Sequence, residues 1–162
     1  MIELIFLVET RASNKSDWMY IKSTLDFYYE QRTYGISKIF TKTKSQLIDQ
    51  NENIKIKISN SSRTPKVIVV ADYDRDENLN DKIIVYCKDN DYDLVWMNLD
   101  IEDVYLGKQI PSNTKGKEAI NFQTKKDKLF PLITTLNNKS PLQKRHTSNI
   151  LCILDKYLTR KK

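Results

Sequence analysis

The sequence has few of the residues that build disulfides or soft-metal sites. Only two cysteines, Cys87 and Cys152, and one histidine, His146, occur among its 162 residues. Each cysteine lies in an apolar, helix-like pattern without a metal-ligating neighbour, so we expect two buried free thiols in a reducing compartment. A single histidine has no second imidazole with which to share a metal, and we assign His146 no catalytic role. A chain of this length can bury a substantial core without covalent staples.

The sequence also lacks any long apolar stretch. No window approaches the roughly eighteen apolar residues of a membrane-spanning helix. The apolar segment Ile2 to Val8 meets Glu9 too early for a signal peptide. There is neither an internal repeat nor a linker long enough to separate a second domain. We therefore expect one cytoplasmic domain over residues 1–162, without membrane contact, in which an α/β core over residues 1–107 precedes a basic, mostly helical extension over residues 108–162.

The charge is unevenly divided along the chain. Residues 1–107 contain 14 Lys and Arg against 18 Asp and Glu, a balance of −4, whereas residues 108–162 contain 13 against 3, a balance of +10. An acidic part beside a basic part suits a polyanionic substrate, with a cation at the reacting phosphate and lysines on the neighbouring phosphates. The alternative is that lysines are simply frequent in this sequence and solvate its surface.

The most informative stretch joins an apolar run to a cluster of acids. Residues 67–71 (Val-Ile-Val-Val-Ala) are small or β-branched, and Asp72, Asp74, Asp76 and Glu77 follow. An unbroken apolar run is typical of a strand that is buried on both faces of a parallel sheet. Ligands bind beyond the carboxyl ends of such strands, where Asp72 and Asp74 would lie. Two carboxylates this close repel each other unless they share a cation or a proton, which predicts a divalent-metal site.

The patterns along the chain predict an α/β fold with a mainly parallel sheet, helices on both faces and a C-terminal helical extension. Apolar runs alternate with amphipathic segments, which implies right-handed crossovers. We expect Gly35 to end the first helix and Pro131 to interrupt a later one. The Ile-Lys alternation at residues 53–58 favours an edge strand. The other expected strands cover residues 2–8, 38–43, 67–71 and 94–97, and the expected helices cover residues 17–32, 45–50, 80–91 and 117–135, with a last helix from Pro141.

A third acid should meet the Asp72/Asp74 pair. Glu9 follows the first expected strand, and two βα units separate it from Asp72, so both should lie at the same edge of the sheet. Asp72 and Asp74 can chelate Mg²⁺ or Mn²⁺ through oxygen ligands while the ion keeps several waters. Such an ion can neutralise a phosphodiester, and Glu9 can hold a second ion or act as general acid/base. Glu102, after the last strand, can complete the metal cluster.

Three other interpretations compete for the same acids. An EF-hand loop needs Gly at its sixth position and Glu at its twelfth, which are Glu77 and Ile83 here, so that interpretation fails. A haloacid-dehalogenase-like phosphatase also carries Asp-x-Asp after a strand, normally the first strand, with Thr or Val where this chain has Asp76. The third is an acidic helix N-terminus, which explains Asp76 and Glu77 through the helix dipole but not Asp72 and Asp74.

Taken together, the motifs resemble the Toprim domain of type IA topoisomerases, primases and OLD-family nucleases. Residues 8–10 (Val-Glu-Thr) resemble the Val-Glu-Ser motif of topoisomerases, and residues 71–76 (Ala-Asp-Tyr-Asp-Arg-Asp) resemble Thr-Asp-Pro-Asp-Arg-Glu. Residues 98–106 (Asn-Leu-Asp-Ile-Glu-Asp-Val-Tyr-Leu) are similar to the Asn-Pro-x-Phe-Glu-x-Trp-Leu-Leu segment of small RloB-like Toprim proteins. The resemblance covers roughly residues 1–107. It implies Glu9 as general acid/base and Asp72 and Asp74 as magnesium ligands.

The chain departs from the family pattern at three positions. Thr10 stands where nucleases often have a glycine, so the loop there is less permissive to close phosphate approach. Asp76 is shorter than the third acid of the topoisomerase motif, and Leu99 replaces the proline of the third segment. No tyrosine-nucleophile or ATPase domain is attached, so we expect neither a complete topoisomerase nor a complete OLD protein.

The expected function is Mg²⁺-dependent phosphoryl transfer on nucleic acid by a Toprim nuclease, with DNA favoured over RNA and a role in phage defence implied by the resemblance. One alternative is a non-catalytic nucleic-acid-binding or adaptor protein of the same fold, and a second is a haloacid-dehalogenase-like phosphatase. A protein partner or homodimer remains open. The expected catalytic residues are Glu9, Asp72 and Asp74, the metal ligands are Glu9, Asp72, Asp74, Asp76 and Glu102, and the nucleic-acid-binding lysines are Lys115, Lys117, Lys125 and Lys126.

Overall fold

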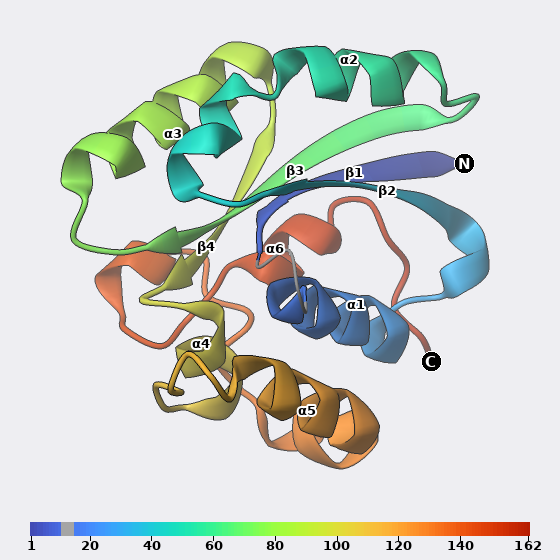
Figure 1. Ribbon diagram of the computed structural model, residues 1–162. Coiled ribbons are helices and arrows are strands. Elements are labelled where there is room, and N and C mark those ends of the chain that lie inside the picture. Colours follow the sequence, from blue (N-terminus) through green and yellow to red (C-terminus); the bar gives the residue numbers. More distant parts are fainter. Residues whose placement is uncertain (11–14) are drawn as a thin grey trace.

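A parallel sheet forms the centre of the molecule. The computed structural model describes residues 1–10 and 15–162, and within them four strands hydrogen-bond in the order β2-β1-β3-β4, with every pair parallel (Figure 1). The strands are β1 (Ile2–Glu9), β2 (Tyr34–Thr41), β3 (Thr64–Tyr73) and β4 (Asp93–Asn98). Helices surround this sheet, which confirms the α/β fold predicted from the alternation of apolar and amphipathic segments.

The apolar runs form the two central strands because both faces of a central strand are covered. Residues 4–8 of β1 are almost completely buried, and residues 67–71 of β3 are buried as well. The chain leaves β1 toward β2 on one side and then returns to place β3 on the other side of β1. The order of the strands therefore reverses between β1 and β3, and in open α/β sheets the crevice beyond the carboxyl ends at such a reversal is where ligands bind.

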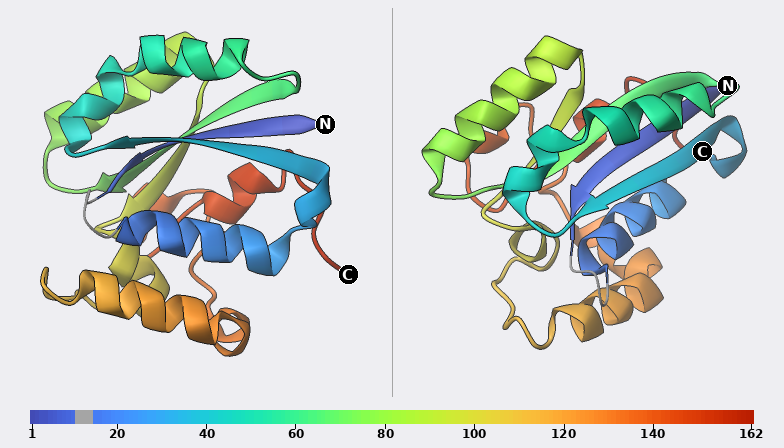
Figure 2. Two further views of the ribbon diagram at one scale, coloured as in Figure 1. Left: turned by 45° about the vertical axis from the view of Figure 1, so that its right-hand side comes forward. Right: turned by 45° about the horizontal axis from the view of Figure 1, so that its top comes forward.

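Helices cover the two faces of the sheet, as predicted, and create two separate apolar cores (Figure 2). One face carries a 3-10 segment η2 (Lys44–Asp49), α2 (Asn51–Ser59) and α3 (Glu77–Asn90). The opposite face carries α1 (Ser16–Tyr28), α4 (Ile101–Leu106) and α6 (Ile150–Leu154), with α5 (Lys115–Leu129) packed outside α1.

Two of the sequence predictions about the segments before β3 are wrong. Residues 53–58, expected as an edge strand, belong to α2, which buries Ile54 and leaves Ile56 and Ile58 exposed. The first helix ends at Tyr28, and Gly35 lies inside β2 instead of ending that helix. A crossover connection between parallel β2 and β3 must pass over one face of the sheet, and a helix is the usual way to do so.

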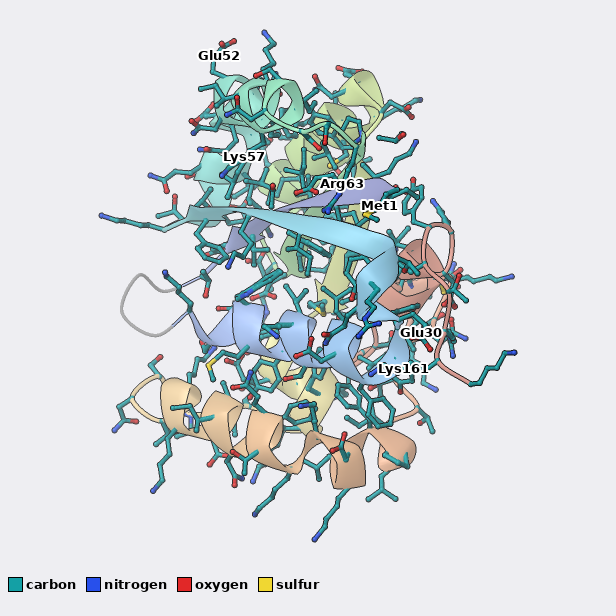
Figure 3. The ribbon with its side chains drawn as sticks, turned by 90° about the vertical axis from the view of Figure 1, so that its right-hand side faces the viewer. Met1, Glu30, Glu52, Lys57, Arg63 and Lys161 are labelled. Carbon is teal, nitrogen blue, oxygen red and sulfur yellow. The ribbon has the colours of Figure 1, made fainter. Side chains whose placement is uncertain are left out.

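Gly35 has a packing role in β2. A side chain at this position would overlap the Arg63 guanidinium and the Glu3 carboxylate. Arg63 donates to Glu3 Oε2 at 3.2 Å, and the Ser37 hydroxyl donates to Glu3 Oε1 at 2.7 Å. Arg63 lies near Met1, at the end of the sheet where the strands begin (Figure 3). The glycine therefore provides space for a partly buried ion pair at the end of the sheet where the strands begin.

The C-terminal third is part of the same core as the sheet. As predicted, the helix is interrupted at Pro131, because α5 is followed by a 3-10 turn (Phe130–Leu132). Pro141, in contrast, opens only a 3-10 turn (Pro141–Gln143), and the last helix, α6, begins later than predicted. Cys87 is buried as expected, whereas Cys152 is partly exposed and its thiol donates to Asn137 Oδ1. No helix among the described residues combines the length and apolar character needed to cross a membrane.

Candidate metal centre at the carboxyl edge of the sheet

The ends of β1 and β3 bring Glu9 and Asp72 to the same edge of the sheet, as the sequence predicts. Val8 pairs with Val70 in the parallel register, so Glu9 and Asp72 both lie just beyond this pair on neighbouring strands. This is the point where the strand order reverses. The two carboxylates therefore stand where the topology favours a ligand site.

A pocket of about 260 Å³ opens at this edge. Glu9, Asp17 and Asp72 line it together with two lysines, Lys42 and Lys115. Thr10 and Ser16 complete its walls. Beneath it lies a small hollow between β1, β3, β4 and α4 that the same three acids also line. Acidic side chains that can hold a cation and lysines that can hold a phosphate thus share one pocket.

Asp17 is the carboxylate that the sequence analysis missed. It lies in the first turn of α1, where sequence reasoning explains an acid by the helix dipole alone. The structure turns this end of α1 toward the carboxyl edge of the sheet, so Asp17 lines the pocket together with Glu9 and Asp72. Burial raises the pKa of Asp17, whereas the nearby Thr10 hydroxyl opposes that shift. Its closeness to Asp72 could not be derived from spacing along the chain.

The electrostatics of the pocket are dominated by carboxylates. Burial raises the pKa of Asp72 well above its ordinary value, and the negative charges of Asp17, Asp100, Glu9 and Glu102 raise it further. Burial likewise raises the pKa of Glu9, with Asp17 adding to the shift and the ammonium of Lys44 opposing it. These carboxylates hold protons more tightly than free ones because they are buried and because their negative charges repel one another, and a divalent cation would relieve that repulsion.

Asp74, expected to act with Asp72, has a different environment. Its carboxylate lies 2.8 Å from the ammonium of Lys44, a buried lysine of η2 that also donates to Asn80. The Asp74 side chain is 49% exposed, and its Oδ1 accepts from the backbone N–H of Asp76. The lysine would have to release Asp74 before this carboxylate could become a metal ligand.

Asp76, predicted as a further metal ligand, is the N-cap of α3. Its Oδ1 accepts from the backbone N–H of Leu79 at 3.1 Å. Glu77 follows in the first turn of the helix. The capping bond satisfies a donor that would otherwise lack a partner, so the structure gives Asp76 the helix-terminus role that was the alternative interpretation.

Glu102 is buried beside the pocket and pairs with its lysine. Lys115 Nζ lies 3.0 Å from Glu102 Oε2 and 3.9 Å from Asp100 Oδ2. The second oxygen, Oε1, is buried without a hydrogen-bond partner in the described part of the chain. Burial raises the pKa of Glu102, and the hydrogen bond from Lys115 opposes that shift. A buried carboxylate oxygen of this kind normally meets a donor, water or ion.

The predicted nucleic-acid-binding lysines divide into two groups. Lys115, at the start of α5, lines the pocket. Lys117 and Lys125 are exposed and Lys126 is partly exposed on α5, which lies in the outer helical layer. None of these three forms an ion pair with a described residue. The structure therefore connects only Lys115 with the acids.

His146 has an unexpected partner. Its Nδ1 lies 3.3 Å from Oδ1 of Asp103, whose side chain is only 1% exposed. The backbone of His146 adopts φ of 60°, in the left-handed region that non-glycine residues rarely occupy. Asp103 belongs to α4, and this contact between segments more than forty residues apart joins the loop before α6 to α4. Sequence spacing contains no signal for it.

The donor set of the pocket fits a magnesium ion. Among residues 1–10 and 15–162 no group of three acidic, histidine or cysteine side chains is already close enough to hold a metal. Mg²⁺, however, keeps several waters and is usually bound through one or two carboxylates together with substrate phosphates. Glu9, Asp17 and Asp72 offer oxygen ligands on one pocket, and the unpaired oxygen of Glu102 lies beside it.

Comparisons with known proteins add nothing to this geometry. Neither the protein-family models, nor the curated proteins, nor the solved structures include a match to this chain. The resemblance to Toprim domains therefore stays a prediction from the motifs, and what the structure establishes is an α/β fold with a carboxylate-lined pocket at the reversal of its strand order.

Proposed function

We propose that this protein performs Mg²⁺-dependent phosphoryl transfer on nucleic acid and acts as a nuclease. The observation that carries the proposal is that Glu9, Asp17 and Asp72 line one pocket together with Lys42 and Lys115. Phosphodiester cleavage needs a cation at the reacting phosphate and positive side chains for the phosphate oxygens. The position of the pocket at the reversal of strand order and the motifs around Glu9 and Asp72 support the same chemistry.

Asp72, with Glu9 and Asp17, would hold the ion. When bound, Mg²⁺ supplies charge that polarises the phosphate and stabilises the leaving oxygen. Lys42 and Lys115 bind the nonbridging phosphate oxygens. Glu9 takes a proton from the attacking water, a role that a carboxylate lining the pocket can perform. Lys115 must release Glu102 to do its part, or bind the phosphate with its remaining donors.

Metal binding and cleavage test the proposal separately. Mn²⁺ is titrated calorimetrically into the wild type and the Asp72→Asn variant, with Asp81→Asn on exposed α3 as a control of equal charge change. Asp72→Asn should weaken Mn²⁺ binding by about tenfold or more, and it should slow Mg²⁺-dependent cleavage of labelled DNA and RNA strands by about a hundredfold. Equal Mn²⁺ affinity in wild type and Asp72→Asn would overturn the site.

A second function is favoured by one observation. Lys44 already pairs with Asp74, and Lys115 already pairs with Glu102, so the protein's own cations neutralise two of the acids predicted to hold metal. This arrangement fits a nucleic-acid-binding or adaptor protein that uses the fold without catalysis. Such a protein would bind a strand but show no cleavage with Mg²⁺ or Mn²⁺, whereas turnover of a generic aryl phosphate would point to the phosphatase alternative.

A further inference from the structure

The two outer strands of the sheet, β2 and β4, differ in whether their free side is covered. The edge of β4 is covered, because residues 147–149 run beside it and bond to it through Asn98, Met97 and Trp96. The edge of β2 has no strand paired to it among the described residues. Figure 3 faces this edge, with β2 crossing in front between α1 and α2. An open strand edge presents backbone groups and side chains to a partner.

Apolar and basic side chains alternate on one face of β2. Lys38 and Phe40 stand beside Phe6 and Val8 in the parallel register and so face the α1 side of the sheet. Ile36, two residues earlier on this face, is 38% exposed, Lys38 is exposed and Phe40 is partly exposed. Lys42 directly follows the strand and lines the acidic pocket. This face of β2 therefore ends at the pocket.

Aromatic rings hold the cations of this face in place. Lys38 Nζ lies 5.3 Å from the ring centroid of Trp18, and Lys15 Nζ lies 5.4 Å from that of Phe40. Trp18 itself packs against Phe40 with ring centroids 6.1 Å apart. None of Lys15, Lys38 and Lys42 forms an ion pair with an acidic side chain in the described part of the chain. A ring orients an ammonium without cancelling its charge, so these cations remain available to phosphates.

We propose that Ile36, Lys38, Phe40, Lys42 and Lys15, which we call the β2 track, bind a single strand of nucleic acid and direct it into the pocket. The inference rests on the proposed function for what happens in the pocket, and names the surface that selects the substrate. Lys38 and Lys42 are four residues apart, about 13 Å along a strand. That distance exceeds the spacing of neighbouring phosphates and suits the phosphates of non-adjacent nucleotides on an extended backbone.

The alternation favours an unpaired strand over a duplex. Proteins that bind single strands combine cations that follow the backbone with apolar or aromatic side chains that contact the base faces. Phe40 lies between Lys38 and Lys42, and Ile36 precedes Lys38. Both side chains can contact bases only where those bases are exposed, as they are in an unpaired strand. A duplex would offer the same phosphates but keep its base faces hidden.

Binding in EDTA tests the track independently of catalysis. Fluorescence anisotropy of a labelled oligothymidylate strand of about 15 nucleotides is measured at several salt concentrations for wild type, the double variant Lys38→Gln/Lys42→Gln, and the control Lys82→Gln/Lys88→Gln on exposed α3. The track variant should weaken binding about tenfold at 0.1 M salt and flatten the slope of log affinity against log salt by about 1.4, that is ~0.7 for each lost phosphate contact. The control should match wild type within about twofold.

Charge-preserving variants and a competitor complete the test. Lys38→Arg/Lys42→Arg should keep the affinity and the salt dependence of wild type. An unlabelled duplex of equal length should compete at least tenfold more weakly than the single strand. Equal weakening by the control double variant, equal competition by the duplex, or absence of wild-type binding would each overturn the track. Because EDTA removes metal, the anisotropy result is the same whether or not Mg²⁺-dependent cleavage is found, so failure of the track and failure of the nuclease proposal are distinguishable.

Discussion

Asp72 should destabilise the metal-free protein at neutral pH. The folded state raises its pKa through burial and four neighbouring carboxylates, so the folded chain binds the Asp72 proton more tightly than the unfolded chain, whose pKa stays near 3.8. Ionisation therefore costs folding free energy, and this cost is absent below about pH 4 and grows as the pH rises toward the folded-state pKa. The Asp72→Asn variant removes that cost.

The change is measurable by scanning calorimetry in EDTA. Asp72→Asn should raise the Tm at about pH 8 by roughly 2–4 °C, the shift that about 1 kcal/mol produces in a chain of this size, and by much less near pH 4. Asp81→Asn on exposed α3 serves as the control and should shift the Tm little at either pH. A gain that does not depend on pH would contradict the electrostatic cause.

Gly35→Ala should disturb the ion pair between Arg63 and Glu3. The added methyl group would overlap both side chains, and moving them breaks a partly buried pair. We expect a loss of about 1–3 kcal/mol in the free energy of unfolding, measured by urea denaturation. Arg63→Ala alone removes the ion pair but leaves the space. In the double variant the loss should be smaller than the sum of the two single losses, because the new methyl group no longer meets the guanidinium; additive losses would rule out this clash.

At the scale of residues, the sequence predicts correctly that Glu9 and Asp72 lie at the same edge of the sheet, because each directly follows an apolar run and parallel strands end at one edge. Asp17 could not be predicted, because its place depends on how α1 crosses the sheet. Asp74 and Asp76 have the right spacing for chelation, yet one pairs with Lys44 and the other caps α3. Local contacts of a carboxylate, such as an ion pair with a lysine or a capping hydrogen bond, thus decide which of several adjacent acids line the pocket.

At the scale of elements, Asn149 covers part of the outer edge of β4. Its Oδ1 accepts from the backbone N–H of Trp96 at 2.9 Å, and its Nδ2 donates to the carbonyl of Leu94 at 3.0 Å, so one amide side chain replaces a neighbouring strand. Asn149→Ala leaves both backbone groups without partners and should cost about 2–4 kcal/mol in urea denaturation.

A second variant separates the two hydrogen bonds of Asn149. Asn149→Asp keeps the acceptor for Trp96 but places an acidic oxygen beside the Leu94 carbonyl, so its stability should also fall below that of wild type. Hydrogen exchange at the Trp96 amide should accelerate strongly in Asn149→Ala and less in Asn149→Asp, which retains the acceptor. Equal acceleration in the two variants would show that the side-chain acceptor does not protect this amide.

The strands and most helices were predictable because long apolar runs and spaced apolar positions reflect burial directly. Residues 53–58 misled that reasoning, since three isoleucines at alternate positions match a strand with one buried face. In the helix only Ile54 is buried, while Ile56 is 54% exposed. The need for a crossover between β2 and β3 outweighs the local alternation, and that need is visible only once both strands are known to be parallel.

At the scale of the whole molecule, the basic C-terminal third completes the core beneath the sheet. Buried residues of β1 and α1 share one apolar cluster with residues from α5, α6 and the segments between them. The members of this cluster beyond residue 107 are Ala119, Phe122, Phe130, Leu136, Ile150, Leu151, Ile153, Leu154 and Leu158. The charge division at residue 107 therefore does not coincide with a division of the apolar core.

A chain truncated to residues 1–107 should consequently fail to fold. Loss of the C-terminal members would expose one apolar face of the sheet and of α1, and exposed patches of that size cause aggregation. Circular dichroism and NMR dispersion should show an unfolded or aggregated fragment, and adding the fragment 108–162 during refolding should restore native signals because it supplies the missing side chains. A dispersed spectrum and cooperative melting of residues 1–107 alone would contradict this, and would mean that the face of the sheet occupied by α2 and α3 suffices to stabilise the strands.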